Sequence, residues 1–158
     1  MRPRESAETR ARSERGVTLA ELVAVVAIDG LFAAVAIPEM GSYIRAARVR
    51  SGNDGLVNDL RAARYIAVTN RTSETLTFNA GAGTYSYPDI RGNTVTRTLD
   101  TGVTMTVTNG PVTFGADGGI STSPPTIVVT GRYNSSLTDT YTITVNATGK
   151  VTSAFVRS

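Results

Sequence analysis

An apolar segment near the start of the chain limits the possible folds more than any other feature. Residues 17–38 read VTLAELVAVVAIDGLFAAVAIP, and Asp29 carries the only charge between Leu22 and Ile37. A membrane-spanning helix needs about 20 mainly apolar residues, which this segment supplies. A helix that is apolar on every side must lie in lipid or against other helices, and the remaining chain is too small to surround it. We therefore predict a transmembrane helix that can also pack against copies of itself.

The residues before this helix are polar and rich in arginine. Residues 1–16 hold five Arg and three Glu, so the positive-inside rule predicts a cytoplasmic N-terminus and a head on the other side of the membrane. The whole chain has 16 basic and 13 acidic side chains, and residues 17–158 have 11 basic and 10 acidic ones. A net charge of +1 is not typical of a strong general nucleic-acid binder.

Three other interpretations of the apolar segment remain open. It could be an ordinary signal peptide with Ala34-Val35-Ala36 as the cleavage site, although Asp29 and Pro38 fit that pattern poorly. It could be a simple membrane anchor with no further role. It could also be the core helix of a soluble protein.

Two carboxylates, Glu21 and Asp29, are out of place in an apolar helix, where each would cost about 2.5–3.5 kcal/mol near the middle of a bilayer. If the chain were cut after Gly16, the new amine of Val17 would lie about one helical turn from Glu21. The two groups could then neutralise each other, within one chain or between neighbours. Asp29 has no such partner nearby, and both pairing with an Arg of a neighbour and protonation in lipid stay open.

A second helical pattern occupies residues 39–70. Leu56, Leu60, Ala63 and Ala67 recur at helical spacing and form one apolar stripe, which we expect to pack on a sheet. Pro38 removes a backbone hydrogen bond and predicts a kink. The segment Ser51–Gly55 contains two glycines and predicts a kink or a short break.

Residues 71–158 alternate apolar residues with threonine, which is typical of half-buried strands. The strands that we predict are 75–79, 84–87, 94–100, 103–108, 126–130, 140–145 and 150–156. Asn109-Gly110, Asp117-Gly118-Gly119 and Thr148-Gly149 predict turns. The predicted fold class is α+β, with a long N-terminal transmembrane helix packed against a C-terminal antiparallel sheet head.

The composition excludes several kinds of chemistry. The chain has no Cys and no His, which excludes disulfides, thiolate metal sites and a Ser-His-Asp triad. Four aspartates of the head, Asp89, Asp100, Asp117 and Asp139, lie beside turn residues, and we interpret them as turn or capping residues. We predict no catalytic residues, no metal site, no cofactor and no enzymatic activity.

The start of the chain resembles a known processing site. Arg15-Gly16-Val17-Thr18-Leu19-Ala20-Glu21 is similar to the class III leader junction of type IV pilins and type II secretion pseudopilins. The resemblance implies that a prepilin peptidase cuts between Gly16 and Val17 and N-methylates Val17. It implies that Glu21 guides filament assembly by pairing with a neighbour's N-terminus. Pro38 falls where the family commonly has a helix proline, whereas Val17 (usually Phe) and Asp29 depart from the pattern.

Later segments resemble the GspH/FimT family of pseudopilins. The resemblance rests on residues 60–71 (a helix end), 75–78 (a first strand), 112–118 (a turn) and 143–151 (a closing hairpin). It implies a cleaved leader at 1–16, a filament-core helix at 17–38, an amphipathic continuation at 39–70 and a β-rich head at 71–158.

The function implied is that of a minor pilin or pseudopilin that initiates or modifies filament assembly, with other pilins as partners. The precursor would lie in the bacterial inner membrane with a periplasmic head, and the mature subunit in a periplasmic or extracellular filament. Two alternatives stay open. One is a DNA-binding minor pilin, for which Arg132, Lys150 and Arg157 are the candidates, and the other is a membrane-anchored periplasmic protein with no filament role. The sequence does not choose between a secretion pseudopilus and a type IV pilus.

Overall fold

The computed structural model describes residues 17–158, except for the side chains of residues 35–39. The predicted leader, residues 1–16, lies outside the described residues, and this range includes Gly16 of the predicted cleavage site. The chain divides into two compact units with the boundary between Pro38 and Glu39, and each unit is described by itself. The helix α1 (Leu19–Asn70) contributes its first part to one unit and its remainder to the other.

The first unit consists of the apolar part of α1. Every described side chain from Val17 to Ala34 is exposed, and Leu19, Leu31 and Phe32 are 82%, 68% and 70% exposed. Pro38, where we predicted a kink, lies inside α1 and its side chain is outside the described ones. Among the described residues, we find no helix that is both long enough and apolar enough to span a membrane.

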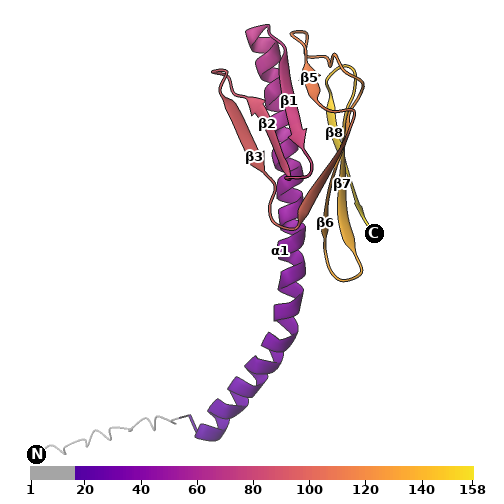
Figure 1. The fold of residues 1–158 in the computed structure, drawn as a ribbon. Helices are drawn as coiled ribbons and strands as arrows, with labels where there is room; N and C mark the ends of the chain where they lie inside the picture. Colours follow the sequence, from indigo (N-terminus) through magenta and orange to yellow (C-terminus); the bar gives the residue numbers. More distant parts are fainter. Residues whose placement is uncertain (1–16) are drawn as a thin grey trace, which may run out of the picture. The chain divides into compact units, whose positions relative to one another are not determined.

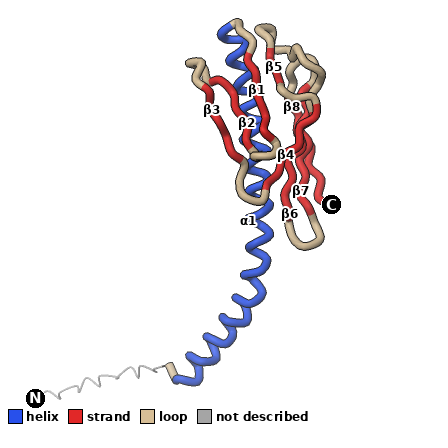
Figure 2. The backbone as a smooth tube through the Cα atoms, in the orientation of Figure 1, coloured by secondary structure: helices blue, strands red, loops and turns tan. Residues whose placement is uncertain are grey.

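The second unit combines the rest of α1 with two antiparallel sheets of four strands each (Figures 1 and 2). The strands are β1 (Glu74–Asn79), β2 (Thr84–Pro88), β3 (Thr94–Thr98), β4 (Val103–Thr108), β5 (Val112–Phe114), β6 (Thr126–Arg132), β7 (Thr138–Val145) and β8 (Val151–Arg157). Their order is β3-β2-β1-β5 in the first sheet and β4-β6-β7-β8 in the second. The predicted α+β class is confirmed, and the predicted sheet is in fact two sheets.

The core of this unit joins the predicted helix stripe to both sheets. The stripe residues Leu56, Leu60, Ala63 and Ala67 are all 0% exposed. They share one cluster of buried side chains with Leu76 of the first sheet and Ile143 of the second. Fully burying a Leu or Ile side chain stabilises a fold by about 1.5–3 kcal/mol. The stripe therefore holds the helix against both sheets.

We predicted a kink or a short break at Ser51–Gly55. The kink stays a prediction. The break is wrong, because α1 is continuous through this segment. Its residues instead serve close packing. A Cβ atom on Gly52 would lie 3.2 Å from Cδ2 of Leu99, which is tighter than most real contacts. The neighbouring Asn53 is 3% exposed and accepts a 2.7 Å hydrogen bond from the hydroxyl of Ser153 in β8. The helical penalty of glycine is thus offset by contacts with the sheets.

One strand, β5, was not predicted. The three residues Val112–Phe114 resemble a turn in sequence, but they pair with β1 in the register Leu76 with Val112 and Glu74 with Phe114. Val112 and Phe114 are both 0% exposed. A three-residue strand beside a proline gives too short an alternation to be recognised from sequence.

Candidate functional site

The first turn of α1 is closed by a reciprocal pair of hydrogen bonds. The helix begins at Leu19, so Thr18 is its N-cap and Glu21 is its third residue. The Thr18 hydroxyl accepts a hydrogen bond from the Glu21 amide at 3.2 Å, and Oε2 of Glu21 accepts one from the Thr18 amide at 2.8 Å. The same Oε2 accepts a second bond, 2.9 Å long, from the Thr18 hydroxyl. This arrangement is a capping box, and the pattern T-x-x-E at residues 18–21 signals it in the sequence.

The cap leaves part of the Glu21 carboxylate available. Two of the three hydrogen bonds end on Oε2 of Glu21, and the third is donated by the backbone amide of Glu21. Oε1 accepts none from the described residues. Glu21 is also solvent-exposed. The carboxylate can therefore complete its own helix start and still accept a hydrogen bond from a cationic group of another molecule.

Asp29 is also exposed in the isolated chain. The ion pairs found among the described residues are Arg50 with Asp54, Arg97 with Asp59 and Arg157 with Asp139. Asp29 takes part in none of these three. Pairing of Asp29 with an Arg of a neighbouring chain therefore stays a prediction.

The candidate DNA-binding residue Arg157 is held by an internal partner. Its Nε and Nη2 donate to the two carboxylate oxygens of Asp139 at 2.5 and 3.0 Å. The hydrogen bond with Asp139 raises the pKa of Arg157. The guanidinium also lies over the ring of Tyr133, 3.8 Å from its centroid. Asp139 is 2% exposed and lies inside β7, so our interpretation of it as a turn residue is wrong.

The other two candidates for DNA binding, Arg132 and Lys150, lie at opposite ends of the second sheet. Arg132 is the last residue of β6 and pairs with Thr138 at the start of β7. Lys150 is in the turn after β7, where its amide donates to the side chain of Asn146. The eight residues of β7 separate the two ends by about 25 Å. Arg132, Lys150 and Arg157 therefore do not form one basic surface.

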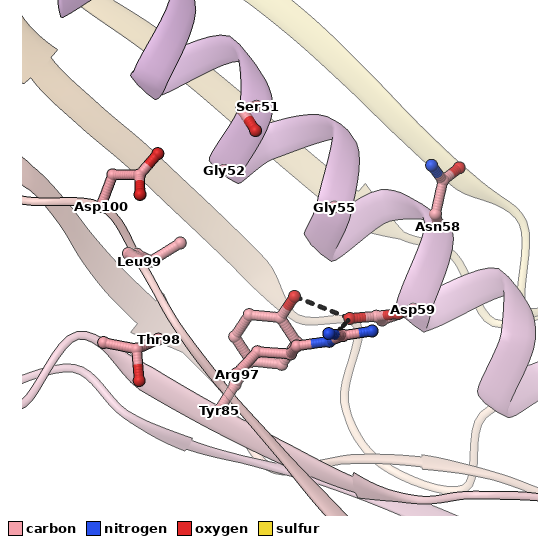
Figure 3. A pocket seen from close by; sticks show the side chains of 10 residues that line it. All are labelled: Ser51, Gly52, Gly55, Asn58, Asp59, Tyr85, Arg97, Thr98, Leu99 and Asp100. Atoms are coloured by element: carbon pink, nitrogen blue, oxygen red, sulfur yellow. Dashed lines mark hydrogen bonds and ion pairs between the residues drawn. The ribbon is translucent and has the colours of Figure 1, made fainter.

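A polar cluster links α1 to the first sheet beside a pocket of about 430 Å³ (Figure 3). Asp59 of α1 accepts hydrogen bonds from the hydroxyls of Tyr85 at 2.8 Å and Tyr87 at 2.9 Å. Arg97 of β3 lies 3.5 Å from the same carboxylate. Burial raises the pKa of Tyr85, and the hydrogen bond to Asp59 raises it further.

These groups satisfy one another, and they hold α1 on β2 and β3. Among the described side chains, no three acidic groups lie close enough together to hold a metal ion.

A long helix packed against antiparallel sheets at its C-terminal part, as in the second unit, defines a pilin-like α+β fold. No family model matches the sequence, and no curated protein matches it. Solved structures do share the fold.

One similar structure is the minor pseudopilin EpsH from the type 2 secretion system of Vibrio cholerae, with a TM-score of 0.55 and 9% identity over 68% of this chain and 96% of that chain. The type IV minor pilin FimU of Pseudomonas aeruginosa is similar in two crystal forms. One gives a TM-score of 0.53 and 15% identity over 66% of this chain and 91% of that chain. The other crystal form gives a TM-score of 0.54 and 13% identity over 70% of this chain and 90% of that chain. At this level of identity the likeness establishes the fold.

Proposed function

We propose that this chain is a minor pilin or pseudopilin of the GspH/FimT type, a structural subunit that initiates or modifies the assembly of a filament. The observation that carries the proposal is the contrast between its two units. The second unit has a closed core of its own, whereas the first exposes nine large apolar side chains. Each of these would contribute about 1.5–3 kcal/mol if it were buried. The fold shared with a minor pseudopilin and a minor pilin supports a filament as the place of burial.

The same apolar residues suit two surroundings in succession. In the precursor, residues 17–38 would cross the inner membrane with the leader in the cytoplasm and the head in the periplasm. A prepilin peptidase would then cut between Gly16 and Val17 and methylate Val17. The released helix would pack beside the helices of other pilins, so that helix contacts replace lipid contacts. One similar structure comes from a secretion system and the other is a type IV pilin, so both machines remain candidates.

Glu21 would guide each subunit into position. After cleavage, the amine of Val17 would be a cation at the helix start of every subunit. The free Oε1 of Glu21 could accept a hydrogen bond from the amine of a neighbour while Oε2 stays bonded to Thr18. A charge-assisted hydrogen bond is stronger where water is excluded, because the attraction between the two charges is then less screened.

Glu21→Gln separates the two roles of this side chain. Glutamine can keep the capping box, but it lacks the charge. We expect the Gln variant to fold and to be strongly depleted from sheared filaments of the native host, measured by quantitative immunoblot. Asp100→Asn is the matched control, since it removes an exposed charge from the head. Normal incorporation of Glu21→Gln would contradict the proposed pairing, and absence of the wild-type chain from filaments would contradict the filament role.

The alternative of DNA capture is less well supported, because Arg157 is bound to Asp139 and the other two candidates lie far apart. A gel-shift titration of the full chain in detergent against salt tests it. Binding that weakens steeply with salt would support DNA capture.

A further inference from the structure

We propose that Arg45, Arg48 and Arg132 form a binding site for a phosphate group. The three arginines line one recess of about 220 Å³ within the second unit. The other lining residues are Thr101, Gly102 and Val103. Arg45 and Arg48 come from one face of α1, and Arg132 comes from the end of β6, 84 residues beyond Arg48 in the chain. Folding therefore brings together cations that the sequence keeps apart.

A close approach of α1 and β6 creates this recess. Gly131 has no side chain, and a Cβ atom there would collide with Cγ2 of Val49. Val49 itself is 1% exposed, so the helix is seated firmly on the strand at this point. Arg48 precedes Val49 in the chain, and Arg132 follows Gly131. Both arginines are exposed, and the close approach of α1 and β6 brings them to the same recess.

Arg45 is fixed in place by hydrogen bonds on one side. Its Nε donates to the carbonyl of Tyr133 at 2.8 Å, and its Nη2 donates to the hydroxyl of Ser42 at 3.3 Å. These bonds leave Nη1 without a partner among the described residues. A guanidinium that is already held in one orientation loses little conformational freedom when it binds an anion.

Among the residues that the structure describes, the recess has no counter-charge. None of the described lining residues is acidic, and the three ion pairs found in the described part of the chain involve other arginines. Three cations in one recess repel one another, so a bound anion would relieve this repulsion. Arginine suits phosphate in particular, because its planar set of N–H donors can bind two oxygens at once. The hydroxyl of Thr101 can add a neutral donor.

We assign the phosphate to a phospholipid head group, because the recess lies close in sequence to the proposed membrane helix. This assignment rests on the proposed function. Arg45 follows Pro38, the end of the proposed membrane helix, by only seven residues, which is at most about 25 Å of chain. An anionic head group at the membrane surface would hold the head in place until the subunit leaves the membrane. Free inorganic phosphate shares the chemistry and is distinguished by experiment.

The test uses the full chain in neutral detergent micelles, with the side-chain Nε–H signals of arginine followed by NMR. Titration with inorganic phosphate should shift the Arg48 and Arg132 signals along a saturable curve. Arg48→Gln and Arg132→Gln should each weaken this binding by about tenfold, since each loses a charge-assisted interaction. Arg50→Gln is the matched control, because Arg50 lies on the same helix, is paired with Asp54 and is not part of the recess. Its effect should be smaller than about twofold.

A second titration identifies the source. Micelles doped with phosphatidylglycerol should shift the same two signals at lower concentration than inorganic phosphate does, whereas phosphatidylcholine should not. Shifts with inorganic phosphate alone would support the phosphate site and overturn its assignment to lipid. No saturable shift, or equal losses in Arg50→Gln and Arg48→Gln, would overturn the site itself. The NMR titration does not require filaments. A failure of the phosphate-site proposal is therefore distinguishable from a failure of the proposed filament role.

Discussion

Thr18 and Glu21 hydrogen-bond each other across the first turn of α1, the hydroxyl of one accepting from the amide of the other and the carboxylate accepting in return. The residue that we expect to guide assembly is therefore also part of the local helix start. The two roles are compatible because Thr18 contacts only one carboxylate oxygen. A loss of assembly in a Glu21 variant is informative only if the cap is preserved.

The cap can be tested by itself. Thr18→Ala removes the oxygen that accepts from the Glu21 amide, so we expect the first turn to open more often. Hydrogen exchange of the amide of Glu21, measured in neutral micelles, should become about fivefold faster. Thr18→Ser keeps the oxygen and should exchange at nearly the wild-type rate. Equal exchange in the wild type and Thr18→Ala would contradict the capping box.

The ion pair of Asp139 and Arg157 should be important for the stability of the head. Arg157→Gln leaves a carboxylate that is 2% exposed without its cationic partner. Breaking a buried pair in this way is strongly destabilising, and we expect the melting temperature to fall by about 5 °C or more.

Two further variants check this explanation by the same thermal melts. Arg91→Gln removes an exposed charge elsewhere and should have little effect. The double variant Asp139→Asn with Arg157→Gln should recover part of the loss, because no buried charge remains. No recovery in the double variant would show that the cost arises from lost packing on Tyr133 instead.

The tyrosines bonded to Asp59 should make stability sensitive to alkaline pH. The pKa of Tyr85 is raised in the folded state, chiefly by burial and then by the Asp59 hydrogen bond, and the pKa of Tyr87 is raised by the same causes. The folded state therefore keeps these protons more tightly than the unfolded state. The stabilisation is complete below the unfolded pKa of about 10, and it is lost as the pH rises above that value.

Tyr85→Phe should reduce this alkaline loss, measured as urea unfolding between pH 8 and 11. It should also lower the free energy of unfolding at neutral pH by about 1 kcal/mol, because Asp59 loses one donor. Tyr65→Phe is the control, since Tyr65 is 64% exposed. An unchanged alkaline slope in Tyr85→Phe would contradict the explanation.

The close approach of α1 and β6 should tolerate no side chain at Gly131. Gly131→Ala places a methyl group against Val49, and overpacking of this kind costs about 1–3 kcal/mol of stability. Gly81→Ala is a suitable control, because its Cβ would meet only the Asn79 side chain at 3.7 Å. Chemical denaturation compares the two. Equal stability of Gly131→Ala and the wild type would show that the helix can move away without cost.

Periodicity was sufficient to predict the helix stripe and most strands from the sequence. Leu56 and Leu60 recur with the helical period, and Val103 and Met105 alternate with threonine, and all four are buried as expected. These patterns are local, so a single sequence contains them. The turn roles of Asp89 and Asp117 were also predicted correctly, because each carboxylate accepts from amides within four residues.

The features that were missed depend on contacts distant in sequence or on very short segments. Asp139 resembles a turn residue until Arg157 is placed beside it on the adjacent strand. Gly52 resembles a helix breaker until Leu99 is packed against it. The capping box at residues 18–21 differs from these features, because its full signal, T-x-x-E, lies within four consecutive residues of the sequence.

The N-terminus of the native protein gives the most direct test of the filament proposal. Filaments sheared from the native host should be analysed by mass spectrometry of the intact chain and of its N-terminal peptide. We predict a mature chain that begins at an N-methylated Val17 and co-isolates with other pilin-like subunits. A chain that retains residues 1–16, one that begins at Ile37, or one that never co-isolates with filaments would contradict the account.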